Sequence, residues 1–558
     1  MKRAVVMSET RLVDAADLEL GYPSGGFYTK NAFITNLAGG NWIGLFIQDN
    51  YRVNANLTIE GGFRWDYRRQ PVEEHNNLAA FYPLSKTFQS GDALLISALP
   101  DSANDALCSQ AYLQSATGQC LVATSAQRKQ FGFNANQARQ VSLGPGHGNF
   151  SPRLAISIRP TGSDKLVVHV GGGVFLDLPL TNQLGSTVDN NPITTQNPVY
   201  NTSFGAPPPL TNGVPTTTQQ MFVGSIVPTL AESFGQLMPS PFYHTPTVYE
   251  WSFSVQTQVA SNLAVELAYL GNRGIHEDYE HPTGNQPAPG VGPLQQRRPW
   301  PDFNTLRFDT YDAFSNYNAL TVKVTKRTSR GLSGLVAYTY SKALDDGSGT
   351  SETETPPQDD NNIRTEYGQS DTALRQRLSV SGTYQFPFGK GRQFLNSVGP
   401  WVNELAGGWD LSMIVTAQSG TPFSVLSASD FSNTGSGNAR PDRTCSGIGK
   451  KSVNNWFDQS CFNTVALQTA LANGTPRFGN SGRNIIPGPS FVDLDNSLIK
   501  RFSIVDKVNM EFRAEFFNIL NHPNFALPDS TIGTGSVGII SNTTGNSREI
   551  QLGLKMSF

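Results

Sequence analysis

The sequence predicts an all-β fold, a transmembrane antiparallel β-barrel, on three observations: composition, strand pattern and the lengths of the connections. The 558-residue chain contains 53 Gly, 35 Pro, 33 Phe and 17 Tyr, and only 15% of its residues are charged. This composition is typical of strands and turns rather than of helices. Segments with alternating apolar and polar residues recur along the chain, and we expect about 14–16 strands from this period.

The strands come in pairs, and the first pair shows the pattern. Leu57, Phe63 and Tyr67 fall on one face of the segment 56–69, and Glu60 and Arg64 fall on the other. Successive side chains of a strand point to opposite faces, so one face is apolar and the other is charged. The predicted strand segments are 42–53, 56–69, 152–160, 165–178, 248–259, 263–271, 317–328, 332–344, 377–388, 407–420, 492–502, 507–520 and 547–558.

The connections are sorted by length. Tight turns such as 260–262 and 329–331 follow the first strand of a pair, and long polar loops follow the second. Outer-membrane barrels have short periplasmic turns and long extracellular loops, whereas the turns of a soluble sandwich are not sorted in this way. Segments of about 10–14 residues also suit a tilted bilayer crossing. A sandwich with its charges in solvent is the alternative.

The two faces have the chemistry of such a barrel. Glu511, Arg513 and Glu515 share one face of the segment 507–520, opposite Met510 and Phe512, so we expect these three charged residues to face a wet lumen. Tyr and Trp prefer the headgroup region of a membrane. Aromatic residues expected near strand ends are Trp42, Tyr51, Trp65, Tyr67, Tyr249, Trp251, Tyr338, Tyr340, Tyr384 and Trp409.

Charge and hydropathy exclude several classes of protein. The net charge of −3 gives no field that would favour nucleic acid. No apolar run approaches the 18 residues of a helical span. The first residues lack the apolar core of a secretory signal. Two interpretations of that beginning are open: the protein stays inside the cell, or the chain lacks its true N-terminus.

Four cysteines lie in two local pairs within polar loops, Cys108 with Cys120 and Cys445 with Cys461. Two local disulfides, and hence an oxidising compartment, are the preferred interpretation. Free thiols are the alternative, and the absence of a CxxC spacing argues against a zinc site.

Several segments together resemble the TonB-dependent outer-membrane receptors of the Oar-like type. They include "GLFIQDNYRVNANLTIEGGFRWDY", "SPRLAISIRPTGSDKLVVHVGGGVFLD", "EWSFSVQTQVASNLAVELAYLGNRGIH", "SNYNALTVKVTKRTSRGLSGLVAYTYSKALDD", "GGWDLSMIVTAQSGTPFSV" and "RAEFFNILNHPNF". The resemblance implies a barrel of the 22-strand type closed by a plug, in the cell outer membrane, that takes energy from the TonB complex. It also implies long extracellular loops and a large ligand, such as a carbohydrate, peptide, siderophore or protein.

The resemblance covers residues 41–558, which are expected to form an incomplete barrel. Residues 1–40 are expected to be an N-terminal remnant or a partial barrel strand, because no plug or TonB-contacting segment is visible there. The chain therefore looks like the C-terminal part of a receptor, and a closed barrel would need further strands, since unpaired edges in lipid are costly.

No catalytic constellation accompanies this pattern, so the protein is not expected to be an enzyme and no cofactor is expected. The densest cluster of candidate ligands is "HEDYEH", from His276 to His281. It could bind a metal in an extracellular loop, but an ordinary solvated loop is preferred, because the spacing fits no known metal motif.

The final strand, "SREIQLGLKMSF", ends on an aromatic residue preceded by alternating apolar residues. By the resemblance, Leu554, Met556 and Phe558 form the signal read by the barrel-assembly machinery, and deleting Phe558 should reduce outer-membrane assembly. Two functions are carried forward: a TonB-dependent receptor or transporter for uptake or export, and a secreted or surface-exposed β-rich adhesin without transport.

Overall fold

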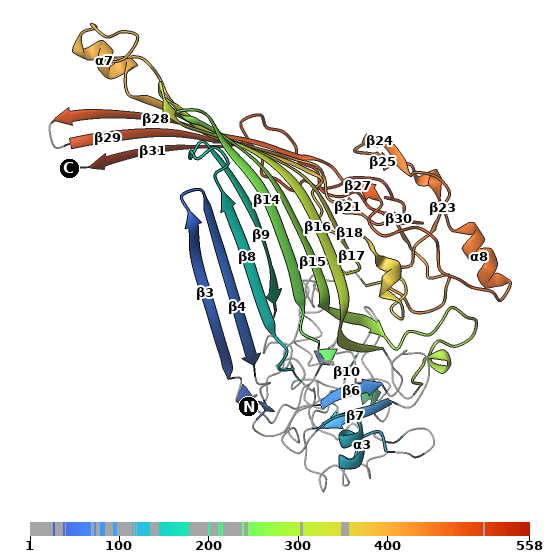
Figure 1. Cartoon of the computed structure of the whole chain (residues 1–558). Coiled ribbons are helices and arrows are strands. Elements are labelled where there is room, and N and C mark those ends of the chain that lie inside the picture. The colour runs from blue at the N-terminus through green and yellow to red at the C-terminus, as the bar shows by residue number, and fades with distance from the viewer. Residues whose placement is uncertain are drawn as a thin grey trace.

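A computed structural model of the chain describes residues 41–68, 120–133, 146–177, 244–301, 305–347, 356–505 and 508–557, together with several short isolated segments. One curved antiparallel sheet dominates these residues (Figure 1). Its thirteen long strands follow one another in chain order, and each strand between the two edges pairs with the strand before and the strand after it. The fold is therefore a continuous antiparallel meander, as the sequence predicts.

The long strands are β3 (Trp42–Asn54), β4 (Leu57–Arg68), β8 (Phe150–Ile158), β9 (Leu166–Leu176), β14 (Thr247–Ala260), β15 (Leu263–Gly284), β16 (Leu306–Ser329), β17 (Leu332–Asp345), β19 (Gln376–Gln385), β20 (Trp409–Gln418), β28 (Phe491–Val505), β29 (Val508–Phe517) and β31 (Glu549–Ser557). Two short strands, β13 (Leu237–Met238) and β18 (Gly368–Gln369), join the same sheet, which then has fifteen strands. In the described part of the chain, β3 and β31 are the sheet edges.

The strand register places most apolar and most polar side chains on opposite faces of the sheet, with exceptions such as Phe46, Leu270 and Ile414 on the polar face and Lys500 on the apolar face. The face that carries Glu60, Glu250 and Glu511 is called the polar face. The face that carries Phe63 and Phe253 is called the apolar face. Register pairs such as Gly62 with Arg153, Ser252 with Leu270 and Arg501 with Glu511 continue the polar face from strand to strand. The apolar face remains exposed in the isolated chain, for example at Ile47, Phe63 and Leu554. The predicted alternation is confirmed.

The aromatic residues follow the same division, with one exception. The ring of Trp251 lies over Gly271, its register partner on β15, so close that a Cβ at Gly271 would be 2.3 Å from the indole Nε1. The other predicted girdle residues also lie on the apolar face by register, but Trp42 lies on the polar face, where its Nε1 donates to Asp66 Oδ1 at 2.8 Å. The alternation of apolar and polar residues alone does not show on which face a residue at the end of a strand lies.

The short connections gather at one end of the sheet. Residues 55–56, 159–165, 261–262 and 330–331 join neighbouring strands there. Arg330 and Gly331 both have positive φ, 51° and 81°, as a two-residue hairpin turn requires. One connection at this end differs from the prediction, because residues 386–408 are longer and contain the helix α7 (Pro400–Ala406).

The long connections lie at the opposite end, where β15 and β16 extend past the rest of the sheet (Figure 1). These strands have 22 and 24 residues, about twice what a tilted crossing of the membrane needs. The connections also contain the helices α3 (Ser125–Gln130) and α8 (Val465–Ala472) and short 3-10 turns. No helix in the described residues has the length and hydropathy to cross a membrane.

Candidate functional site

The polar face of the sheet carries hydrogen-bonded and ion-paired side chains along its length. On the first strands Gln48 donates to Glu60 at 2.7 Å, and Arg64 pairs with Asp66 at 2.6 Å. Side chains alternate between the two faces along each strand, so every second residue lies on this face. The result is a hydrophilic surface that faces away from the apolar side.

A charged ladder continues this surface on the last strands. Arg501 on β28 pairs with Asp410 on β20 and donates to Glu511 on β29 at 2.8 Å, and Glu511 also accepts from Arg513. Glu515 lies on the same face, opposite Ser497 and Gln551. The three residues expected in the lumen thus share one face, and two of them contact each other.

A hollow of about 300 Å³ opens on the polar face beside β9. The glycines at 171 and 173 lie at this space, which is lined by the polar residues Gln48, Glu60, Arg153 and Glu250 and by apolar residues that include Phe175 and Leu270. A Cβ at Gly173 would lie 3.0 Å from Arg153 Cγ. The glycines therefore make room for longer polar side chains on the neighbouring strands.

Beyond the sheet, the long connections form one packed structure, which we call the outer loop cluster: the described residues of 285–305, 346–375, 419–490 and 518–548. It has its own apolar core. The buried core residues are Phe423, Val425, Trp456, Phe457, Cys461, Phe462, Ile486 and Ile540. A disulfide, the pairing expected from the sequence, joins the exposed Cys445 to Cys461 of this core. Cys120 is also disulfide-bonded, and Cys108 lies outside the described residues.

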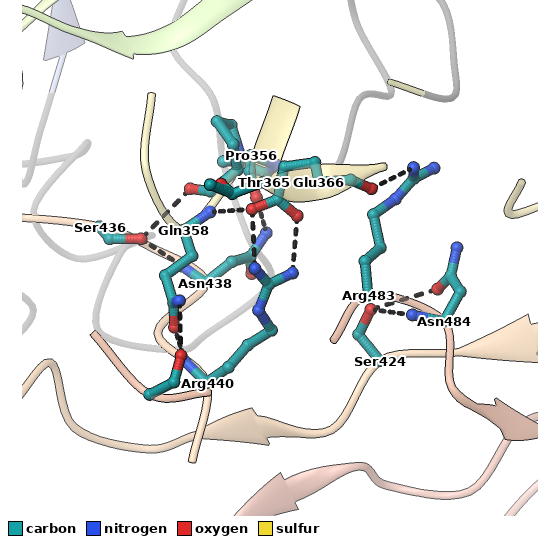
Figure 2. A network of polar contacts seen from close by, with 12 residues as sticks. Pro356, Gln358, Thr365, Glu366, Ser424, Ser436, Asn438, Arg440, Arg483 and Asn484 are labelled. Atoms are coloured by element: carbon teal, nitrogen blue, oxygen red, sulfur yellow. Dashed lines mark hydrogen bonds and ion pairs between the residues drawn. The ribbon is translucent and has the colours of Figure 1, made fainter. Parts of the chain in front are cut away.

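A buried ion pair connects two of the loops (Figure 2). Both carboxylate oxygens of Glu366 accept from the Arg440 guanidinium, at 2.6 and 2.8 Å, and the two side chains are 5% and 6% exposed. The backbone N–H of Gln358 also donates to Glu366, and the Arg440 N–H donates to the Gln358 side chain. The β17–β19 and β20–β28 connections are therefore held together by charge-assisted hydrogen bonds.

A second buried arginine ties the cluster to the end of the sheet. Arg483 donates to Asp345, the last residue of β17, at 2.7 Å, and it lies within 3.4 Å of Asp371. Its neighbour Asn484 bonds both Ser424 and Gln369. Gln286 joins a third loop, because its amide group bonds the backbone of Gln358 and Asp360 and the hydroxyl of Thr434.

Ionisable groups in the cluster respond to these surroundings. Burial raises the pKa of Asp346 to about 6, although its carboxylate accepts from the Phe314 N–H at 2.8 Å. Hydrogen bonds from Arg477 hold the pKa of Asp442 below its usual value. Asp346 is thus a loop carboxyl that can change charge near neutral pH.

The "HEDYEH" segment is not a solvated loop but the extension of β15. His281 is buried, and its two ring nitrogens lie 2.9 Å from Asp360 Oδ1 and 3.0 Å from Thr310 Oγ1. His276 stacks on His244 with ring centroids 5.1 Å apart. Within the described ranges, no three His, Cys, Asp or Glu side chains are grouped as a metal site requires. The expectation of a solvated loop was wrong because the strand continues beyond the membrane length.

Sequence reasoning missed the buried polar residues of the cluster. Glu366 and Arg440 are 74 residues apart, and neither stands in a recognisable motif. The only local signal was composition: the connection 419–490 has a cysteine pair and aromatic residues that a simple solvated loop does not need.

Comparison with known proteins gives a family. The model of the outer membrane beta barrel domain family matches residues 5–551. No curated protein matches the chain by sequence. Similar solved structures include the outer membrane transporter YddB from Escherichia coli, at 8% identity and a TM-score of 0.42, with 96% of this chain and 54% of that chain covered.

Two others are the FrpB iron transporter from Neisseria meningitidis and the siderophore receptor PiuA from Acinetobacter baumannii. They have identities of 11% and 9% and TM-scores of 0.39 and 0.36. The alignments cover 99% and 92% of this chain, and 49% and 43% of those chains. The chain therefore spans about half the length of the solved structures that it matches.

Proposed function

The chain belongs to the outer membrane beta barrel domain family and lies in the outer membrane, and from this premise we propose that it is the barrel of a TonB-dependent receptor. The Oar-like type is the form that its sequence segments resemble. In this proposal residues 41–558 form the barrel, residues 1–40 precede it, and the ligand crosses along the polar face. The ligand is a carbohydrate, a peptide, a siderophore or a protein.

The observation that carries the proposal is the pairing of a charged inner surface with a built outer loop cluster. A transport barrel needs a wet surface for a polar ligand and a structure outside the membrane that binds it. The ladder around Glu511 and the hollow beside Arg153 supply the first. The loops joined through Glu366 and Arg440 supply the second, since buried ion pairs hold loops in one arrangement.

The same arrangement supports a receptor without catalysis. The ionisable side chains of the cluster that we describe are engaged with one another, as Arg483 is with Asp345, and form structural contacts between loops. The proposed partners are outer-membrane lipid, the barrel-assembly machinery and the TonB complex, which is reached through a plug.

Energised uptake tests the proposal. A strain that lacks the gene and a complemented strain would receive three labelled probes: an oligosaccharide, an oligopeptide and a ferric siderophore. We expect the complemented strain to accumulate one probe more strongly, and a protonophore to abolish the difference. If the two strains accumulated each of the three probes equally, and the deletion strain lost surface adherence, the protein would instead be an adhesin.

A further inference from the structure

The connection between β19 and β20, residues 386–408, has an exposed apolar surface at the short-turn end of the sheet. Its helix α7 projects beyond the strand ends (Figure 1). Trp401 is 89% exposed, Leu405 is 77% exposed and Val402 is 48% exposed. These positions fall within one arc of a helix, so together they form one apolar side.

The opposite side of the helix binds its own connection. The side-chain oxygen of Asn403 accepts from the backbone N–H of Lys390 at 2.6 Å. The helix is therefore held by its polar side, and its apolar side is turned outward. Neither Trp401 nor Leu405 is among the buried residues of the described chain.

The end of α7 is attached to the apolar face of the sheet. Trp409 Nε1 donates to the Leu405 carbonyl at 2.9 Å, and Lys500 Nζ donates to the Gly407 carbonyl. Trp409 and Lys500 are register partners, and Leu411 and Leu498 are the next pair on the same face. In an outer-membrane barrel this face meets lipid, so the exposed side of α7 continues an established lipid surface.

We infer that α7 is an interfacial anchor that inserts Trp401 and Leu405 into the periplasmic leaflet of the outer membrane. The short-turn end of such a barrel is periplasmic. Tryptophan favours the headgroup region, and a short amphipathic helix lies in the plane of the interface with its apolar side in the acyl boundary. Lys390 and Arg392 are exposed on the same connection and line a hollow of about 500 Å³ with Arg501, Glu511 and Lys555 of the polar face, on the polar side of the helix. Glu404 is the exposed acidic residue of the helix.

Spin labelling tests this anchor. None of the described cysteines is free, so Leu405→Cys provides one labelling site in the full-length protein reconstituted in phosphatidylethanolamine–phosphatidylglycerol vesicles. Collisions of the nitroxide with molecular oxygen, which concentrates in lipid, are compared with collisions with an aqueous nickel complex. Val465→Cys is the matched control, because Val465 is a 63% exposed helical residue in the outer loop cluster.

We expect the ratio of oxygen to nickel collisions at position 405 to be several times the ratio at position 465. Trp401→Cys repeats the measurement if the first variant assembles poorly. A ratio at 405 equal to the control would place the helix in water and overturn the inference. Low collision rates with both reagents would place a protein partner over α7 and also overturn it.

Discussion

Replacing Glu366 with glutamine should loosen the outer loop cluster without unfolding the sheet. The substitution keeps the size of the side chain and one oxygen that can accept from the Gln358 N–H, but it removes the charge that faces Arg440. Arg440 is 6% exposed, so water cannot replace the two hydrogen bonds of 2.6 and 2.8 Å. The variant therefore leaves a buried guanidinium without its counter-charge.

The magnitude follows from that burial. Removing one partner of a buried ion pair costs about 3–5 kcal/mol, whereas an exposed pair contributes about 1 kcal/mol or less. Each 1.4 kcal/mol changes an equilibrium constant about tenfold. The equilibrium constant for local opening of the cluster should thus rise by roughly two to three and a half powers of ten.

Hydrogen exchange measured by mass spectrometry would report this opening in peptides that cover Gln358 and Arg440, whose amides both donate within the network. Lys450→Gln is the control in the same cluster, because Lys450 is exposed. A double variant with Glu366→Leu and Arg440→Met should restore most of the protection, because no buried charge remains. If Glu366→Gln exchanged no faster than the Lys450 control, the ion pair would not hold the loops together.

Three further outcomes follow from the structure. The pKa of Asp346 in the fold, about 6, lies above its unfolded value of about 3.9, so the stability from this group is present below pH ~3.9 and lost as pH rises through about 6. Asp346→Asn should therefore slow exchange of the cluster near pH 8 but not near pH 4, and equal effects at both pH values would contradict this sign. Reducing the Cys445–Cys461 disulfide should cost the cluster about 3 kcal/mol by loop entropy, seen as faster proteolytic nicking between the two cysteines, and unchanged nicking would oppose this. Val380→Lys places a charge on the apolar face of β19 and should lower the unfolding free energy in lipid by about 2–4 kcal/mol. Ser379→Lys, on the polar face of the same strand, should lower it little. Equal losses of unfolding free energy in urea titrations would mean that the two faces are misassigned.

The sheet could be predicted because its signal is local. The register of β4 depends on residues that alternate within one segment, so Phe63 and Arg64 could be assigned to opposite faces without knowledge of the partner strand. The lengths of turns and loops then indicated a membrane barrel rather than a sandwich. The alternation in one segment is a weak signal for a strand. The same alternation recurs in many segments along the chain, and together they predict the sheet.

The loop cluster could not be predicted, because its contacts join residues that are far apart in sequence. The pairing of Arg483 with Asp345 crosses 138 positions, and no period or motif relates the two. The helix α7 was a different case, because local signals existed: Pro400 stands at its first turn, and Gly407 follows its end.

The unbroken meander also bears on how such a sheet can change during evolution. Two successive strands bring the chain back to the end of the sheet from which it started. Duplicating or deleting one hairpin, such as β16 with β17, therefore leaves every remaining strand pointing in its original direction. Gain or loss of a single strand would exchange the two ends for all the strands that follow. Selection on this architecture should consequently act on hairpins as heritable units, with strand number drifting in steps of two.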